Sequence, residues 1–366
     1  MGVNLDSRVQ NIFRNSEEQI DCILIKNSDE PFIDNNFFYA AGLDKGLFEG
    51  SIAVLYPEGN IKLIVSQLEL EIAKKTEAEV NFYKNKKEYD EILNDSISQF
   101  NNVGLNFDSI THKDFTSLKD QFPRINFLDV SESFQKSRLI KDKEEINLIK
   151  EACRISDKIV EKIPEILKPE MKEYELAAEI DYLMQKNGAD KSAFETISSF
   201  GKNSSEPHYS HGESKLKEGV FVLCDFGACH KKYNSDITRT FVFGKASNEQ
   251  KEMYDTVLGA QKTGFEAIRP GIKACEVHKK VSAFIDDSKY KGRFIHSTGH
   301  SLGLAVHDGG RLGDNCEMEL KEGMVFTVEP GIYIPGFGGV RIEDDILIKK
   351  DGIEILSKSP KDLIEI

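Results

Sequence analysis

The chain has 366 residues, of which 39% are hydrophobic and 30% charged, and its formal net charge is -14. This length exceeds the roughly 250 to 300 residues at which one hydrophobic core stops growing, so the sequence predicts two domains. The acidic balance, which no basic stripe offsets, argues against nucleic acid or an anionic membrane surface as a partner, and no apolar run approaches the roughly 18 residues of a membrane span.

Short apolar runs alternate with helical patterns in the first third of the chain. The expected strands are Cys22–Ile25, Ser51–Tyr56, Ile61–Ser66, Val103–Asn106 and Asn126–Val130. The expected helices are one capped by Ser66 and running through Lys75, one near 88–100 and one near 112–121. A Pro-Glu-Gly-Asn turn at 57–60 makes a hairpin of the second and third strands. We therefore expect a small α/β domain over residues 1–135, without a catalytic cluster.

A polar, charged stretch at 131–143 predicts a domain boundary. After it, apolar residues recur at helical spacing from Glu144 to Ile166. Two helices followed by a strand pair are expected at about 144–244 and again at about 248–355, which suggests internal pseudo-symmetry. The sequence thus predicts an α+β domain over residues 136–366.

Two consecutive apolar runs in this second domain each deliver a carboxylate, Asp225 and Asp236. If the runs form a hairpin that turns between His230 and Lys231, the two residues lie opposite each other with Cβ atoms about 4.5–5.5 Å apart. Two like charges in one patch cost free energy unless a cation lies between them. The pair favours a metal site, and the alternative is two solvated carboxylates beside a loop.

The segment Met324–Asp344 has the same form, with a turn rich in Gly and Pro. Pairing about Gly336 sets Glu329 opposite Glu343 and turns Asp344 to the other face. Each hairpin is therefore expected to present a pair of carboxylates inward.

Three histidines, His296, His300 and His307, lie close together between the two hairpins, among glycines that let the backbone approach a ligand. One of them could bind a metal. Four carboxylates and one imidazole supply mostly oxygen ligands, which suits Mn²⁺ or a similar divalent ion better than a structural zinc site. Two metals would satisfy so many carboxylates.

These segments resemble the signature of the pita-bread metallopeptidases, which include prolidase, Xaa-Pro aminopeptidase and methionine aminopeptidase. The resemblance runs from Glu206 to Asp344 and implies a pita-bread catalytic domain preceded by the smaller α/β domain. It implies five ligands for two divalent ions per subunit, with the second and the last bridging the ions: Asp225, Asp236, His300, Glu329 and Glu343. Mn²⁺ is expected, with Co²⁺, Fe²⁺ and Zn²⁺ as alternatives.

The resemblance also implies that His208 and His307 contact the substrate and stabilise the transition state. Our hypothesis is that a hydroxide bridging the metals attacks the carbonyl of the bond before proline, and that Glu329 passes a proton to the leaving nitrogen. Arg341 is expected to pair with a site carboxylate or with a substrate carboxylate. Four histidines are expected to be packing or surface residues: His211, His230, His278 and His296.

An N-terminal domain distinguishes the members of this group. Methionine aminopeptidases consist essentially of the catalytic domain, whereas prolidases and Xaa-Pro aminopeptidases carry a further α/β domain, as this chain does. The sequence thus predicts an Xaa-Pro dipeptidase or aminopeptidase that acts on proline-containing dipeptides or oligopeptides, and the resemblance implies a homodimer. A methionine-aminopeptidase-like or other non-proline aminopeptidase is the alternative on the same fold. One departure is Lys202, where relatives usually place Pro in the substrate loop.

Two alternatives belong to other classes. Gly299–Gly303 fits the Gly-x-Ser-x-Gly elbow of serine hydrolases, with Ser301 as nucleophile. That class places an acid and then a histidine after the serine, but the last histidine here is His307, so no triad can be assembled. The second alternative is a non-catalytic peptide-binding module, and the retention of all five ligand positions argues against it.

Six scattered cysteines form no C-x-x-C pair, so free thiols are expected. The first residues, Met1 to Ser7, lack the basic and apolar regions of a secretory leader. Together these features predict a cytoplasmic protein.

Overall fold

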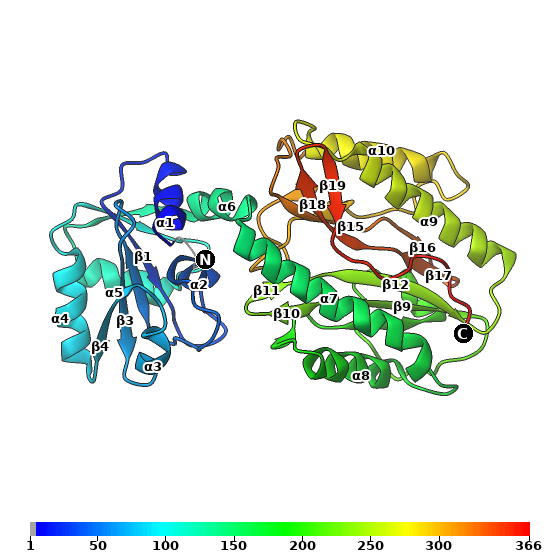
Figure 1. The fold of residues 1–366 in the computed structure, drawn as a ribbon, viewed down its shortest axis with the longest axis horizontal. Helices are drawn as coiled ribbons and strands as arrows, with labels where there is room; N and C mark the ends of the chain where they lie inside the picture. Colours follow the sequence, from blue (N-terminus) through cyan, green and yellow to red (C-terminus); the bar gives the residue numbers. More distant parts are fainter. Residues whose placement is uncertain (1–4) are drawn as a thin grey trace. The chain divides into compact units, whose positions relative to one another are not determined.

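The computed structural model of the chain describes residues 5–366 and divides into two compact units between Arg138 and Leu139 (Figure 1). Residues 1–4, part of the segment without a leader pattern, lie outside the described residues. Among the helices of residues 5–366, none combines the length and the apolar character that crossing a bilayer requires.

The first unit contains a six-stranded sheet in the order β4-β3-β2-β1-β5-β6. Its strands are β1 (Cys22–Lys26), β2 (Ile52–Leu55), β3 (Ile61–Ser66), β4 (Glu79–Tyr83), β5 (Asn102–Leu105) and β6 (Asn126–Asp129). Its helices are α1 (Leu5–Arg14), α2 (Asn35–Ala41), α3 (Leu70–Ala73), α4 (Lys86–Ile97), α5 (His112–Gln121) and α6 (Ser131–Leu139), which ends at the first residue of the second unit. The sheet is mixed, because β1 pairs antiparallel with β2 but parallel with β5.

All five strands expected in this unit are present, but the helix expected to run from Ser66 through Lys75 is wrong in its extent. Ser66 is still part of β3, and the short α3 begins only at Leu70, after a residue that makes no side-chain cap. The strand β4 was not expected, because it lies at the edge of the sheet and its residues are mostly half-buried or exposed without a clear alternation.

The second unit begins with two helices and a set of short strands, and this order recurs in its second half. The first half comprises α7 (Lys143–Ile166), α8 (Glu173–Lys186), β7 (Lys191–Ser192), β8 (Ile197–Phe200), the 3₁₀ helix η1 (Gly201–Ser205), β9 (Val220–Phe226), β10 (Ala228–His230), β11 (Tyr233–Asn234) and β12 (Ile237–Phe243). The second half comprises α9 (Asn248–Ala267), α10 (Ala274–Asp286), β13 (Gly299–His300), β14 (Arg311–Leu312), β15 (Val325–Val328), β16 (Gly331–Ile334), β17 (Gly338–Arg341), β18 (Asp344–Lys349) and β19 (Gly352–Ile355).

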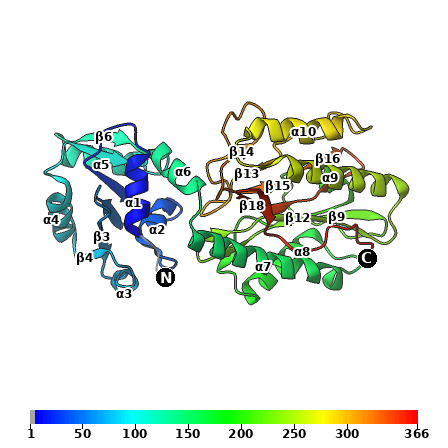
Figure 2. The ribbon, with the colours of Figure 1, turned by 45° about the horizontal axis from the view of Figure 1, so that its top comes forward.

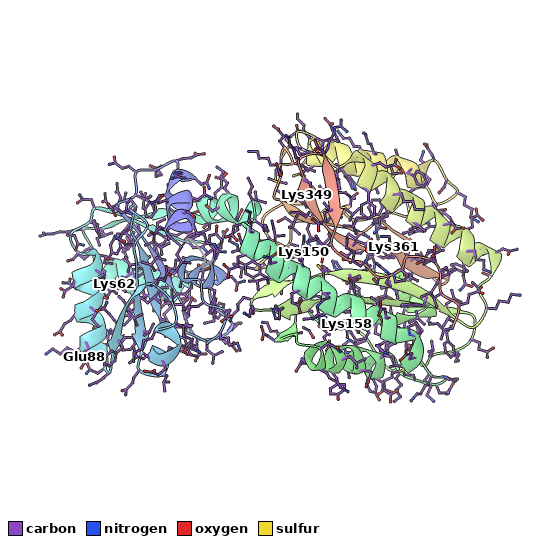
Figure 3. The ribbon with its side chains drawn as sticks, in the orientation of Figure 1. Lys62, Glu88, Lys150, Lys158, Lys349 and Lys361 are labelled. Atoms are coloured by element: carbon purple, nitrogen blue, oxygen red, sulfur yellow. The ribbon has the colours of Figure 1, made fainter. Side chains whose placement is uncertain are left out.

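The strands of the second unit form a central layer that is covered by α7 and α8 on one side and by α9 and α10 on the other (Figure 2). Helix α7 begins with a capping box, in which Asp142 and Glu145 bond each other's backbone N–H groups. It is amphipathic: Ile155 and Ile159 are buried against the strands, while Lys158 points to the outside (Figure 3).

Strand alternation in this layer places the acidic residues. The strands β9 and β12 are buried along nearly their whole length. Cys224, Phe226 and Ile237 pack into the core beneath α7 and α8. The intervening positions, Asp225 and Asp236, therefore face the opposite side of the layer.

Candidate metal centre

A cavity of about 680 Å³ in the second unit gathers every residue that the sequence assigned to the metal or substrate site. Its lining includes His208, Asp225, Asp236, His300, His307, Glu329, Arg341 and Glu343. These residues span more than a hundred positions of the chain, and only the fold brings them together. His211, His230 and His278 are not among the lining residues.

The first hairpin has a different register from the one expected. Asp225 pairs with Thr238 and not with Asp236, because the hairpin turns between Lys231 and Lys232, one position later than expected. Both lysines have positive φ, 49° and 73°, as a two-residue type I′ turn requires. The pairing partner changes by two positions, which preserves the face of every side chain, so both aspartates still point into the cavity.

The second hairpin has the expected register. Gly331 pairs with Arg341 in β16 and β17, and Val328 pairs with Asp344 in β15 and β18, so the two strand pairs share one centre at Gly336. Glu329 and Glu343 lie between these two pairs, in the stretch where the strands are interrupted near Pro330.

Side chains from both hairpins and from β13 converge on one point. Asp236, His300 and Glu343 each offer a ligand atom, and these atoms all lie within 4.8 Å of one another. The Nε2 atom of His300 is 3.5 Å from Oδ2 of Asp236 and 3.6 Å from Oε1 of Glu329. Asp225 lines the same cavity and accepts a hydrogen bond from Arg341.

The carboxylates repel one another. Burial, followed by repulsion from Glu343 and other carboxylates, raises the pKa of Asp236 well above its usual range. Burial and repulsion from Glu329 raise the pKa of Glu343 in the same way. Burial also raises the pKa of Glu329 to about 7. The free energy of this arrangement falls if a cation enters it.

One guanidinium supports the cluster from within the protein. Arg341 is buried and donates to Asp225, to Oγ1 of Thr238 at 3.0 Å and to the Tyr333 hydroxyl at 2.8 Å. Thr238 in turn donates to Oε2 of Glu343 at 2.6 Å. Arg341 carries a single positive charge, which cannot neutralise four carboxylates.

Comparison with known proteins decides the family. Residues 147–350 match the model of metallopeptidase family M24, and residues 8–140 match that of the creatinase/prolidase N-terminal domain. The chain belongs to metallopeptidase family M24. The family and the pita-bread catalytic fold expected from the sequence are thereby confirmed.

Relatives of this metallopeptidase are similar over nearly their full length. The chain is 38% identical over 348 residues to the Xaa-Pro dipeptidase of Pyrococcus furiosus, a match that covers 93% of this chain and 98% of the relative. The crystal structure of the prolidase from Pyrococcus horikoshii OT3 has a TM-score of 0.88 and 37% identity, and covers 98% of this chain and 100% of that one. The X-Pro aminopeptidase from Thermotoga maritima MSB8 has a TM-score of 0.89 and 31% identity, and covers 95% and 98%.

Membership of the M24 family implies divalent metal ions, and the cavity fits them. Among the described residues, the buried Oδ1 atoms of Asp225 and Asp236 have no hydrogen-bond partner. Such unpartnered anionic oxygens are costly unless a cation binds them. Burial lowers the pKa of His300 to about 4, so its imidazole is neutral at neutral pH, which is the form that binds a metal.

Two cavity residues escaped the sequence prediction. His296 was expected to be a packing residue and not a ligand; its ring does pack against Phe294 and Tyr333, but it also lines the cavity, with its Nε2 atom 2.8 Å from the Tyr333 hydroxyl. Arg311 also lines the cavity and pairs with His300 across β13 and β14. The sequence signal was weak for both residues. His296 lies before β13, outside any strand, and Arg311 lies in β14, which has only two residues.

The structure also bears on the serine hydrolase alternative. Ser301 is fully buried, and its hydroxyl donates to the carbonyl oxygen of Asp308 at 2.5 Å. Ser301 does not line the cavity. It is therefore a structural residue and not a nucleophile.

Proposed function

We propose that this M24 metallopeptidase hydrolyses the peptide bond that precedes proline. The observation that carries the proposal is the convergence of four carboxylates and a neutral imidazole on one cavity whose charge the protein does not balance. Relatives that are named Xaa-Pro dipeptidase and X-Pro aminopeptidase support proline as the residue after the cleaved bond.

In this proposal Asp225, Asp236, His300, Glu329 and Glu343 hold two divalent ions, with Mn²⁺ the first candidate. Asp236 and Glu343, both lining the cavity, would contribute to holding both ions, which is the role that the resemblance implies for them. When bound, the ions supply Lewis acidity and lower the pKa of a water molecule toward about 7.

The histidines and Glu329 act on the substrate. Burial lowers the pKa of His307, so its ring is neutral and can donate one N–H to the carbonyl oxygen as negative charge develops there. His208 lines the same cavity from a separate loop and is assigned the same task. Glu329 lies 3.8 Å from His296 and 3.6 Å from His300 and, in this proposal, carries a proton to the leaving nitrogen of proline.

Arg311 favours dipeptides over longer substrates. Its exposed side chain lines the cavity and makes no hydrogen bond or ion pair with any residue of 5–366, whereas Arg341 is committed to Asp225. An Xaa-Pro dipeptide carries its terminal carboxylate one residue beyond the cleaved bond, and a guanidinium can bind this group through two hydrogen bonds. We infer that the enzyme acts mainly as a dipeptidase.

The test is hydrolysis of Gly-Pro and Gly-Pro-Pro by the Mn²⁺-loaded protein. We expect Gly-Pro to be the better substrate. Arg311→Gln should lower kcat/KM for Gly-Pro by about 10- to 100-fold, the value of a charged hydrogen bond, and leave Gly-Pro-Pro nearly unchanged. Arg269→Gln, at an exposed arginine outside the cavity, is the matched control. Equal loss on both peptides would contradict the role of Arg311, and no hydrolysis of either peptide with any divalent metal would contradict the proposed function.

The domain limits 1–135 and 136–366, the homodimer and the cytoplasmic location stay predictions. Sedimentation of the purified protein tests the homodimer directly.

A further inference from the structure

His208 lies on a loop, and the contacts that fix this loop determine where His208 lies in the cavity. We call Gly201–Ser214 the His208 loop. It begins as η1 directly after β8 and has no further regular structure. His208 itself is exposed and lines the cavity, so its position depends on the anchors of the loop and not on packing around its own ring.

The principal anchor is Glu173, the first residue of α8, whose side chain is fully buried. Its Oε1 atom accepts hydrogen bonds from the Phe200 N–H at 2.8 Å and from the Asn203 amide at 2.9 Å. Its Oε2 atom accepts from the Tyr209 hydroxyl at 2.8 Å and from the Gly212 N–H at 3.1 Å. One carboxylate thus binds the residue just before the loop, Phe200, and three residues within the loop.

The backbone at the start of α8 completes the attachment. The N–H groups of Glu173 and Tyr174 donate to the carbonyl oxygens of Ser214 and Gly212, each at 3.2 Å. These are N-terminal helix donors that have no partner inside the helix. The positive end of the helix also favours a negative charge at its first residue. The loop and the helix therefore satisfy each other's polar groups.

A second contact holds the loop against β17. The Gly339 N–H donates to Oγ of Ser204 at 2.8 Å, and a Cβ atom at Gly339 would lie 2.0 Å from the carbonyl oxygen of Ser204. Only glycine allows this approach. Gly339 belongs to β17, the strand that also carries Arg341. The loop is consequently fixed against the same strand that supports Asp225.

We propose that Glu173 is a positioning residue, which holds the His208 loop so that His208 faces the peptide carbonyl during hydrolysis. The inference rests on the proposed function for its effect on catalysis. A carboxylate is required because it accepts at both oxygens, and it meets four donors: three from the loop and one from Phe200 at the end of β8. Glutamine has the same shape, but its amide would turn N–H groups toward donors of the loop. Burial and the hydrogen bond to Glu173 raise the pKa of Tyr209 to about 12, so the phenol stays a donor at neutral pH.

The first test is a cycle of Glu173→Gln and His208→Ala on Gly-Pro hydrolysis by the Mn²⁺-loaded enzyme. Glu173→Gln should lower kcat/KM by about 10- to 100-fold, mainly through kcat, as expected when a contact is misplaced by about 1 Å. Glu179→Gln, on the same helix and outside these contacts, is the matched control and should stay within about twofold. In the His208→Ala background Glu173→Gln should add less than about threefold. Full additivity of the two losses would overturn the proposal.

The second test needs no activity. Lys202 is exposed on the loop, so trypsin cleavage after it reports how firmly the loop is held. Cleavage should be at least about tenfold faster in Glu173→Gln than in the wild type or Glu179→Gln. Equal rates would overturn the anchoring role. If the wild type does not cleave Gly-Pro but Glu173→Gln still speeds trypsin cleavage after Lys202, the proposed function fails while the anchoring role stands.

A milder variant covers the case in which Glu173→Gln does not fold. Tyr209→Phe removes one of the four donors and leaves the carboxylate in place. Like Glu173→Gln, it should lower kcat/KM and speed cleavage after Lys202, but each by only about two- to fivefold, because one neutral donor to a charged acceptor is lost. No change in either measurement would overturn the proposal.

Discussion

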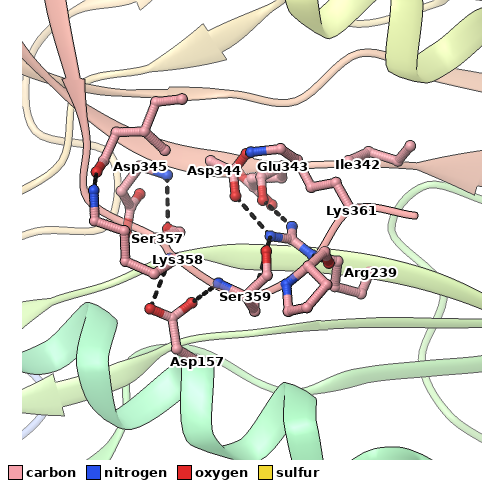
Figure 4. A network of polar contacts seen from close by, with 12 residues as sticks. Asp157, Arg239, Ile342, Glu343, Asp344, Asp345, Ser357, Lys358, Ser359 and Lys361 are labelled. Carbon is pink, nitrogen blue, oxygen red and sulfur yellow. Dashed lines mark hydrogen bonds and ion pairs between the residues drawn. The ribbon is translucent and has the colours of Figure 1, made fainter. Parts of the chain in front are cut away.

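Two neighbouring residues where β18 begins have buried carboxylates in opposite electrostatic conditions. Glu343 and Asp344 are neighbours and are both almost completely buried, at 2% and 0% relative exposure. Glu343 points into the cavity with Asp225, Asp236 and Glu329, the cavity carboxylates. Asp344 points the other way, into a cluster formed with Arg239, Ser359 and Lys361, the Arg239 cluster (Figure 4).

The Arg239 cluster balances its charges within the protein. Asp344 receives Arg239 at one oxygen and Lys361 at the other, both at 2.7 Å. Arg239 also donates to the backbone oxygens of Glu343 at 2.6 Å, Ser359 at 3.0 Å and Pro360 at 3.0 Å, so that none of its three nitrogen atoms lacks a partner.

Among the described residues, Arg341 is the one arginine or lysine that pairs with a cavity carboxylate, and two buried oxygens of these carboxylates have no hydrogen-bond partner. Burial alone therefore does not distinguish a structural carboxylate from a functional one. The source of the compensating positive charge distinguishes them. In the Arg239 cluster arginine and lysine side chains supply it, whereas the cavity must bind cations from solution.

The largest expected effect is on the cavity side. Glu343→Gln removes one charge from the group that could hold an ion and should lower kcat/KM for Gly-Pro by at least about 1000-fold, equivalent to about 4 kcal/mol. Isothermal titration should show weakened Mn²⁺ binding. Glu322→Gln, an exposed residue outside the cavity, should leave both unchanged. Full activity of Glu343→Gln would refute its assignment as a ligand, and Asp236→Ala offers an independent check.

The next effect compares the two neighbours in the absence of metal. Asp344→Asn leaves the buried Arg239 cation without its anion and should lower the free energy of unfolding by about 3–5 kcal/mol. Glu343→Gln relieves repulsion and should leave that free energy unchanged or slightly higher. Urea unfolding in EDTA measures both. A similar loss in the two variants would mean that the cavity carboxylates and the Arg239 cluster do not differ as described.

The cavity carboxylates could be predicted from the sequence, but the Arg239 cluster could not. The cavity carboxylates could be gathered in advance because each sits in a short hairpin, and alternation alone fixes its face. The register about Gly336 was predicted correctly, since the turn is marked by Gly and Pro. The register of the other hairpin was not, because Lys231 and Lys232 give no sign of the positive φ that they adopt.

The Arg239 cluster could not be predicted. Arg239 is more than a hundred positions from Asp344 and from Ser359, and no periodic pattern links these residues. The same holds for the attachment of the His208 loop to Glu173. Such contacts depend on which segments become neighbours in three dimensions, and a single sequence gives that information only where a motif is local.

Metal and pH should act together on the cavity side. Burial and repulsion raise the pKa values of Asp236 and Glu343, and burial raises that of Glu329 to about 7. These groups therefore keep their protons in the metal-free folded protein at a pH where the unfolded chain has released them. The metal-free protein therefore loses stability as the pH rises from about 4 through about 7. A bound cation offsets this loss, because it favours the ionised carboxylates.

The measurement is thermal unfolding in EDTA and in Mn²⁺ at pH 5, 6 and 7.5. The gain in Tm on adding Mn²⁺ should increase across this series, and saturation at 100 times Kd corresponds to about 2.7 kcal/mol. Glu343→Gln should flatten the increase. If the gain in Tm is independent of pH, or falls as the pH rises, repulsion among the cavity carboxylates is not what the bound cation relieves.

The smallest expected effect lies at the edge of the Arg239 cluster. Lys361 is 23% exposed and shares Asp344 with Arg239 and with the amide of Gln261, which donates at 3.1 Å. Lys361→Met keeps most of the alkyl chain and leaves Asp344 paired with Arg239, so the loss in unfolding free energy should be about 1 kcal/mol or less. Because Lys361 acts on the side of the strand away from the cavity, kcat/KM for Gly-Pro should stay within about twofold of the wild type. A loss as large as that of Asp344→Asn would mean that Lys361, and not Arg239, provides the main compensation for the buried charge.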